Sequence, residues 1–114
     1  MRNARSANAI VMPDLPLLDP MFHQPVRTRI AVLLYVGEPS FSELKSSLSI
    51  TDGNLDAHLR KLSAAGYLHS RMVLEGRPHT VYQLSQSGLL AFETYLEALR
   101  EVTVLAGEGR HGPT

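Results

Sequence analysis

Arg60 and Lys61 stand next to each other on a predicted helix, over about residues 52–65, whose two faces differ in residue type. At about 100° per residue, three leucines of this helix fall within about 60° of one another and predict a buried stripe. The stripe consists of Leu55, Leu59 and Leu62. The opposite face has small residues near its start and the two cations farther along; it consists of Gly53, Ala57, Arg60, Lys61 and Ala64, flanked by Asn54 and Asp56.

Contact with a nucleic-acid duplex is the chemistry that this outer face supports. Small side chains let a helix approach a duplex closely, and arginine and lysine reach phosphates or guanine edges. The alternative is an ordinary solvated face that carries a few charges. The pattern of this helix alone leaves both interpretations open.

A predicted hairpin follows the helix, because the hydrophobic pattern changes to a period of two after Gly66. Its strands are expected over residues 67–74 and 79–84, joined by a tight turn. Arg77 follows Gly76 in that turn, where its guanidinium can reach a minor groove or a phosphate. A plain turn with an exposed arginine is the alternative. Helix and hairpin come in the order that a DNA-binding module needs, so together they favour DNA binding more than either does alone.

The five histidines do not form a metal-binding pattern. No pair has the i, i+4 spacing of a helical metal clamp and the sequence has no cysteine, so we expect no metal and no other cofactor. His58 lies at the edge of the leucine stripe, where we expect a hydrogen-bonded structural residue, with a phosphate contact as the alternative. The sequence also lacks a nucleophile elbow, a phosphate loop and a Rossmann glycine pattern, so we expect no enzymatic activity.

The chain has 114 residues, of which 44% are hydrophobic, and this length fits one domain. We expect the domain over residues 17–105, between flexible tails at residues 1–16 and 106–114. The longest apolar run has seven residues, whereas a membrane span needs about 20. Without a membrane span, a secretory h-region or cysteines, we expect a cytoplasmic protein. Eleven basic residues balance eleven acidic ones, so net charge by itself does not indicate a nucleic-acid partner.

The remaining predicted elements are helices. Short helices are expected to begin at Asp19 and to cover residues 25–36 and 41–48, the last of them capped by Ser42. A long amphipathic helix follows the hairpin over about residues 87–105. This order predicts a mainly α fold with a small β-hairpin, which is the outline of a winged helix-turn-helix.

The last predicted helix carries more apolar residues than a domain of this size can bury by itself. Exposed apolar patches of this kind usually mark an interface. We therefore expect a two-fold homodimer in which the terminal helices pack together. The predicted interface residues are Leu17, Leu18, Met21, Phe22, Leu89, Phe92, Tyr95, Leu96, Leu99 and Val102.

Three segments covering about residues 17–99 carry a family resemblance: LDPMFHQPVRTRIAVLLYV, FSELKSSLSITDGNLDAHLRKLSAAGYL and EGRPHTVYQLSQSGLLAFETYLEAL. Their most specific parts are TDGNL-x-x-HL-x-KL-x-x-AGY and, after the hairpin turn, Y-x-L-S-x-x-G. They resemble the small winged-helix transcriptional regulators of the MarR/ArsR-like group. The resemblance implies a homodimer of prokaryotic type that regulates transcription by binding double-stranded operator DNA through residues 51–61 and the hairpin, or wing. The DNA-contacting residues are then Thr51, Asp52, Gly53, Asn54, Asp56, Ala57, His58, Arg60, Lys61 and Arg77.

Two features depart from this family pattern. Asp56 places a negative charge where the family more often has a small polar residue, and the tip of the wing has a single arginine. Together with the neutral net charge, they leave open a second interpretation, a winged-helix module that binds protein and has little affinity for DNA. The sequence indicates neither an operator, nor the sign of regulation, nor a small-molecule effector.

Overall fold

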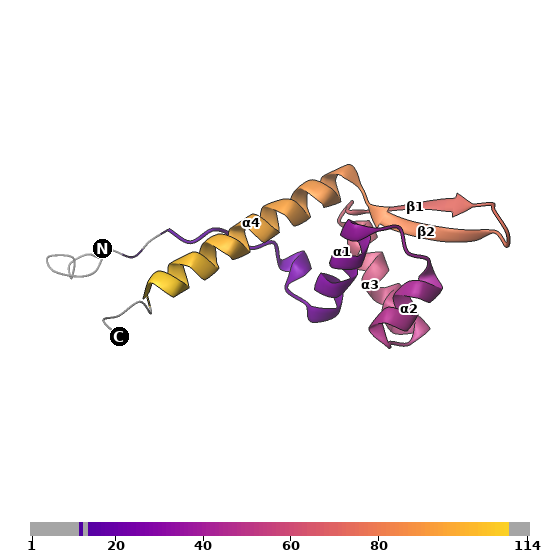
Figure 1. Ribbon diagram of the computed structural model, residues 1–114, viewed down its shortest axis with the longest axis horizontal. Helices are drawn as coiled ribbons and strands as arrows, with labels where there is room; N and C mark the ends of the chain where they lie inside the picture. Colours follow the sequence, from indigo (N-terminus) through magenta and orange to yellow (C-terminus); the bar gives the residue numbers. More distant parts are fainter. Residues whose placement is uncertain (1–11, 13, 110–114) are drawn as a thin grey trace, which may run out of the picture.

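The computed structural model describes residues 12 and 14–109, which form a bundle of helices with a projecting hairpin (Figure 1). The elements in chain order are η2 (Pro20–Phe22), α1 (Pro25–Val36), α2 (Phe41–Leu48), α3 (Asp52–Ala64), β1 (Leu68–Val73), β2 (His79–Leu84) and α4 (Gln86–Gly109). The hairpin points to one end of the molecule and α4 runs to the opposite end (Figure 1). This architecture confirms the predicted mainly α fold, and most predicted boundaries agree within one residue.

Local signals at the starts of α2 and α3 explain where these helices begin. Ser40 and Glu43 form a capping box, in which each side chain accepts a hydrogen bond from the other residue's backbone N–H. The prediction that Ser42 caps α2 is therefore wrong, because Ser40 precedes a glutamate by three residues and Ser42 does not. The Thr51 hydroxyl caps α3 by accepting a hydrogen bond of 3.1 Å from the backbone N–H of Asn54.

Two predicted helices differ in extent from the observed ones. The helix expected at Asp19 is one turn of 3-10 helix, because a new helix starts at Pro25. At the other end, α4 continues to Gly109, four residues into the predicted tail. Ala106 favours helix, and each glycine there costs a formed helix only about 1 kcal/mol. Residues 1–11, 13 and 110–114 of the two predicted tails lie outside the described residues.

The core lies between the helices and the base of the hairpin. Its largest fully buried side chains are Phe22, Ile30, Leu44, Leu55, Leu62 and Phe92. The ring of Phe22 stacks on that of Tyr67 and also packs against those of Phe92 and Tyr95, with centroid distances between 5.1 and 5.7 Å. The leucine stripe predicted for α3 is confirmed, since all three of its leucines are at least 95% buried.

Gly88 fixes how α4 leaves the hairpin. A Cβ at this position would overlap the backbone carbonyl of Tyr67, so only glycine permits this close approach. The neighbouring Ser85 hydroxyl donates a hydrogen bond of 2.6 Å to the carbonyl of Gly66. The first turn of α4 is therefore tied to the residues that end α3, which positions the long helix relative to the wing.

The hairpin is also held at its base by the segment after α1. β1 and β2 pair antiparallel, from Leu68 opposite Leu84 to Val73 opposite His79. The backbone N–H of Tyr82 donates a hydrogen bond of 2.9 Å to the Pro39 carbonyl. Ser40, the cap of α2, forms a bridge with β2. The wing and the helix-turn-helix are thus joined into one body.

Candidate nucleic-acid interface

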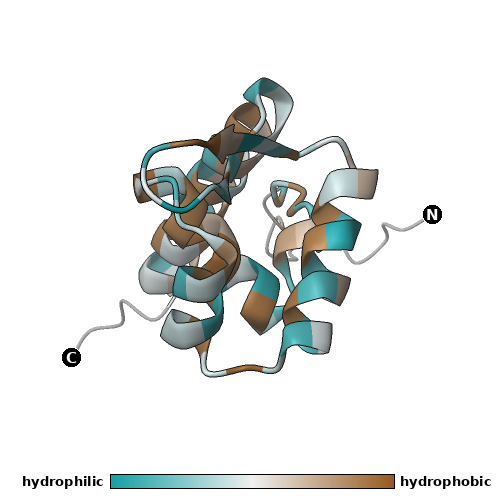
Figure 2. Cartoon of the chain, turned by 90° about the vertical axis from the view of Figure 1, so that its right-hand side faces the viewer, coloured by the Kyte–Doolittle hydropathy of each residue, from teal (hydrophilic) through white to brown (hydrophobic). Residues whose placement is uncertain are grey.

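The outer face of α3 is open to solvent, as predicted. Its leucines point into the core, whereas Asp52, Gly53, Asn54, Ala57, Arg60 and Lys61 are exposed. α3 and α2 lie at the end of the molecule from which the hairpin projects, away from the distal half of α4 (Figure 1). Seen from that end, hydrophilic and hydrophobic segments alternate along the helices (Figure 2). Helix and wing therefore lie at the same end of the molecule, formed by residues 38–82, which we call the hairpin end (Figure 1).

Asp56 and Arg60 form an ion pair on this face. The Nε of Arg60 lies 2.8 Å from Oδ2 of Asp56, one helical turn away, and both side chains are at least half exposed. The sequence placed both residues at the interface as independent charges. In the structure they form one unit, in which the carboxylate partly cancels the charge of the cation.

Lys45 of α2 is a cation beside the start of α3 that sequence reasoning missed. Its Nζ lies 2.9 Å from Oδ1 of Asp52, in the first turn of α3. A signal was available: Leu44 and Leu48 mark the buried side of α2, so Lys45 had to face elsewhere. Its contact with Asp52 depends on the turn between α2 and α3, in which Ser49 adopts the αL conformation with φ 55°. The spacing of the residues in the sequence does not predict this turn.

His58 is half-buried, and its Nδ1 lies 3.4 Å from Nη1 of Arg27 in α1. Partial burial, and then the positive charges of Arg27 and Lys61, lower the pKa of His58 below its ordinary value of 6.5. At neutral pH the ring is therefore uncharged, and its Nδ1 accepts a hydrogen bond from the guanidinium. The Nε of Arg27 also donates to the carbonyl of Met21, at 2.9 Å. This arrangement agrees with the structural role expected for His58 and joins α3 to α1.

The tip of the wing has a defined local geometry. Gly76 adopts φ 66°, in the left-handed region that favours glycine. Arg77 follows it and is exposed, and its carbonyl accepts a hydrogen bond of 2.8 Å from the Nδ1–H of His79. Arg71, in the middle of β1, instead pairs with Glu38 in the segment after α1. Arg77 is therefore the arginine that the wing presents at its tip.

The segment that forms α2, α3 and the wing is neutral by itself, whereas α1 adds Arg27 beside α3 and Arg29 beside α2. Residues 38–82 contain five lysines and arginines and five aspartates and glutamates. Three of the five cations pair with carboxylates of the same region: Lys45, Arg60 and Arg71. Among the described residues, no carboxylate lies within ion-pair distance of the other two, Lys61 and Arg77.

The predicted dimer interface needs correction where its residues belong to the core. Phe22, Phe92 and Tyr95 are at least 93% buried within the chain, because their rings pack against one another and α1. They are not available to a partner. Leu18 and Met21 are half-buried and pack against the same core, and Val102 is half-buried on α4.

The rest of the predicted interface remains on the surface. Leu89, Leu96 and Leu99 are 39–40% exposed, and at about 100° per residue they fall within about 80° of one another on α4. Leu17 is 93% exposed. These three exposed leucines of α4, Leu89, Leu96 and Leu99, form an apolar strip that we call the leucine strip.

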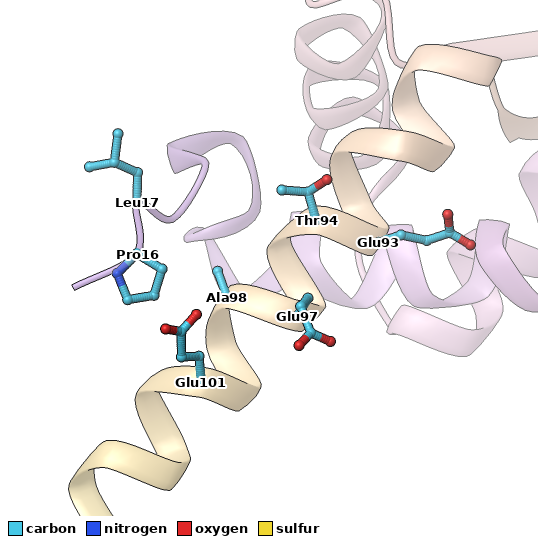
Figure 3. A pocket seen from close by; sticks show the side chains of 7 residues that line it. All are labelled: Pro16, Leu17, Glu93, Thr94, Glu97, Ala98 and Glu101. Atoms are coloured by element: carbon cyan, nitrogen blue, oxygen red, sulfur yellow. The ribbon is translucent and has the colours of Figure 1, made fainter. Parts of the chain in front are cut away.

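A groove of about 460 Å³ runs along a different side of α4 (Figure 3). Ala98 and Glu101 face Pro16 across it, and the neighbouring Leu17 side chain points away from the helix. Its lining residues are Pro16, Leu17, Glu93, Thr94, Glu97, Ala98 and Glu101. Glu93 accepts a hydrogen bond of 3.1 Å from the Tyr35 hydroxyl, and this contact raises the pKa of the phenol.

In the described residues, no three His, Cys, Asp or Glu side chains gather as they do around a metal ion. No helix there combines the length and hydropathy that crossing a bilayer requires.

Comparison with known proteins places the chain in a family. The profile of the winged-helix DNA-binding domain matches residues 26–103. The chain is 35% identical over 85 residues to an uncharacterized protein of Methanocaldococcus jannaschii, and the match covers 73% of this chain and 92% of that protein. A transcriptional regulator homologue from Pyrococcus horikoshii OT3 is 30% identical with a TM-score of 0.67, covering 74% of this chain and 85% of that one.

A MarR-family protein from Enterococcus faecalis V583 shares the fold, with a TM-score of 0.71 and 19% identity over 82% of this chain and 86% of that one. This likeness confirms the predicted winged-helix fold, and the profile match and the Pyrococcus homologue confirm the resemblance to winged-helix transcriptional regulators. The chain therefore belongs to the winged-helix DNA-binding domain family.

Proposed function

We propose that the protein is a homodimeric transcriptional regulator that binds operator DNA with α3 in the major groove. The observation that carries this proposal is the outward face of α3, where Arg60 and Lys61 are exposed directly behind a buried leucine stripe. A helix docked in this way reaches base edges with its outer side chains. The wing then lies over the adjacent minor groove or backbone, where Arg77 contacts phosphate or enters the groove.

The dimer is supported by the leucine strip. Leu89, Leu96 and Leu99 form a surface that is apolar and 39–40% exposed, along the half of α4 that starts at the base of the wing. A two-fold partner that covers this strip holds two copies of α3 at a fixed distance, which reading two half-sites requires. Family membership supports a regulatory, cytoplasmic role without catalysis, and we propose neither a cofactor nor a particular effector.

Replacement of Arg60 and Lys61 by alanine tests the assignment of this face. We expect the double variant to fold normally, because neither side chain contributes to the leucine stripe, and to lose most of its affinity for DNA fragments that the wild type selects from its genome. Arg100→Ala is the matched control, since Arg100 is an exposed cation on α4. Equal binding by the double variant and the wild type contradicts the proposal for α3.

A further inference from the structure

The ion pairs at the hairpin end need an explanation other than folding. The pairs are Lys45–Asp52, Arg60–Asp56 and Arg71–Glu38, and their six side chains are between 41% and 79% exposed. Exposed ion pairs add little to stability, because water already solvates both charges and two long side chains must be ordered. Yet three of the five cations in this region are paired, on the face that we propose contacts DNA.

The geometry of the Arg60–Asp56 pair is informative. Asp56 contacts the Nε of Arg60. A guanidinium that is held at its Nε can still offer its two terminal nitrogens to guanine O6 and N7, which two nitrogens of one arginine bind together. The contact with Asp56 keeps the arginine on the outer face of α3. The same carboxylate repels any phosphate that approaches the cation.

We propose that Asp56 is a specificity-determining residue, which competes with DNA phosphates for Arg60 while holding its guanidinium ready for a guanine. This inference rests on the proposed function, because it assumes that α3 faces DNA. On arbitrary DNA the pair stays closed, so Arg60 contributes little electrostatic affinity. At a correctly placed guanine, Arg60 binds the base through its terminal nitrogens and keeps its contact with Asp56.

Asp52 and Glu38 partly neutralise Lys45 and Arg71 in the same way. Lys61 and Arg77, which have no carboxylate partner among the described residues, then contact phosphates most readily within this segment. The neutral charge of residues 38–82 therefore does not exclude DNA binding. It lowers the background affinity for arbitrary sequences, and a regulator is limited by the ratio of its specific to its non-specific affinity.

Asp56→Asn in the full chain tests this inference, because it removes the charge and keeps the shape. The probe is a random-sequence DNA duplex two helical turns long, with binding followed by fluorescence anisotropy across a salt series. Each cation that gains a phosphate contact steepens the slope of log K against log salt by about 0.9. We expect the slope for Asp56→Asn to be steeper than that of the wild type by this amount per protomer. We also expect the variant to bind several-fold more tightly at low salt.

Glu97→Gln is the matched control. Glu97 pairs with Arg100 on α4, at 3.5 Å and with both side chains more than 70% exposed, so this variant gains the same net charge elsewhere. A wild-type slope in Glu97→Gln beside a steeper one in Asp56→Asn supports the inference. Equal changes in the two variants overturn it, because net charge then explains the effect, and so does weaker binding by Asp56→Asn.

A second binding experiment tests sequence specificity, with a duplex that the wild type selects from a random library. The affinity of Asp56→Asn for this duplex is expected to rise less than its affinity for random DNA, so that their ratio falls. A ratio equal to that of the wild type overturns the specificity role. If neither the wild type nor Asp56→Asn binds any duplex at low salt, the proposed function itself is contradicted. If both bind DNA with the same salt dependence, only the competition of Asp56 with phosphates for Arg60 is contradicted.

Discussion

The hydroxyl of Tyr67 donates a hydrogen bond of 2.6 Å to Oδ2 of Asp19, 48 residues earlier in the chain. The other carboxylate oxygen of Asp19 accepts the backbone N–H of Met21 and so caps η2. One aspartate thus ties the start of the domain to the residue that precedes β1. The bond also orients the Tyr67 ring, on which the buried ring of Phe22 stacks.

Tyr67→Phe is expected to reduce the free energy of unfolding by about 1 kcal/mol, because it removes a hydrogen bond to a charged acceptor and keeps the ring. The bond raises the pKa of Tyr67 above its ordinary value of 10.0. Its stabilisation is therefore complete below the pKa of the unfolded phenol and is lost as the pH rises through the higher folded pKa. Urea denaturation at neutral and alkaline pH measures both effects. A variant as stable as the wild type at neutral pH contradicts this role.

Because of His58, the domain is expected to become less stable at mildly acidic pH. Its pKa in the folded chain is lowered, so below about pH 6.5 the unfolded chain binds a proton that the folded chain does not. We expect the free energy of unfolding to fall as the pH drops from 7 through this range, and to fall less in His58→Gln. Urea denaturation of both proteins across the range measures the difference. Parallel pH profiles would show that His58 does not carry this dependence.

The wing prediction concerns the edges of the DNA site. Arg77→Ala is expected to weaken binding and to remove protection at the outer ends of the footprint, because the wing lies beside the recognition helix over the adjacent groove. Arg100→Ala serves as control, since it removes one cation from α4. A footprint with unchanged edges would show that the tip of the wing does not touch DNA.

The dimer prediction uses the leucine strip as the structure defines it. Leu96→Glu combined with Leu99→Glu places like charges across the two-fold axis, which is expected to cost several kcal/mol of association. Light scattering should then give a folded monomer, with most specific DNA affinity lost. Leu90→Glu is the control, because Leu90 is 66% exposed and lies about 100° or more away around α4. If the double variant stays dimeric, the interface lies elsewhere.

Local patterns were enough to predict the elements of this fold. The leucine spacing of α3 and the period-two segments around Gly76 each depend on neighbouring residues alone, and the structure confirms both. The tertiary position of Phe92 and Tyr95 was not predictable in this way. Their spacing marks an apolar face, and only packing against Phe22 shows that this face is covered within the chain.

The candidate interface was likewise predicted in outline but not in its pairings. The exposure of Arg60 follows from the helix period, and a bridge to Asp56 is available at i, i+4. The pairs of Lys45 with Asp52 and of Arg71 with Glu38 join different elements. These contacts depend on a turn and on a strand register, so residue spacing could not reveal that the region is internally neutralised.

The measurement that tests the central claim most directly is the salt dependence of wild-type binding to a random DNA duplex, beside that of Lys61→Ala. Lys61 is an exposed cation of α3, without a carboxylate partner among the described residues. We expect log K to fall linearly with log salt, and the slope to become shallower by about 0.9 per protomer in the variant. An affinity that does not change with salt, or an identical slope in Lys61→Ala, would contradict DNA binding through α3.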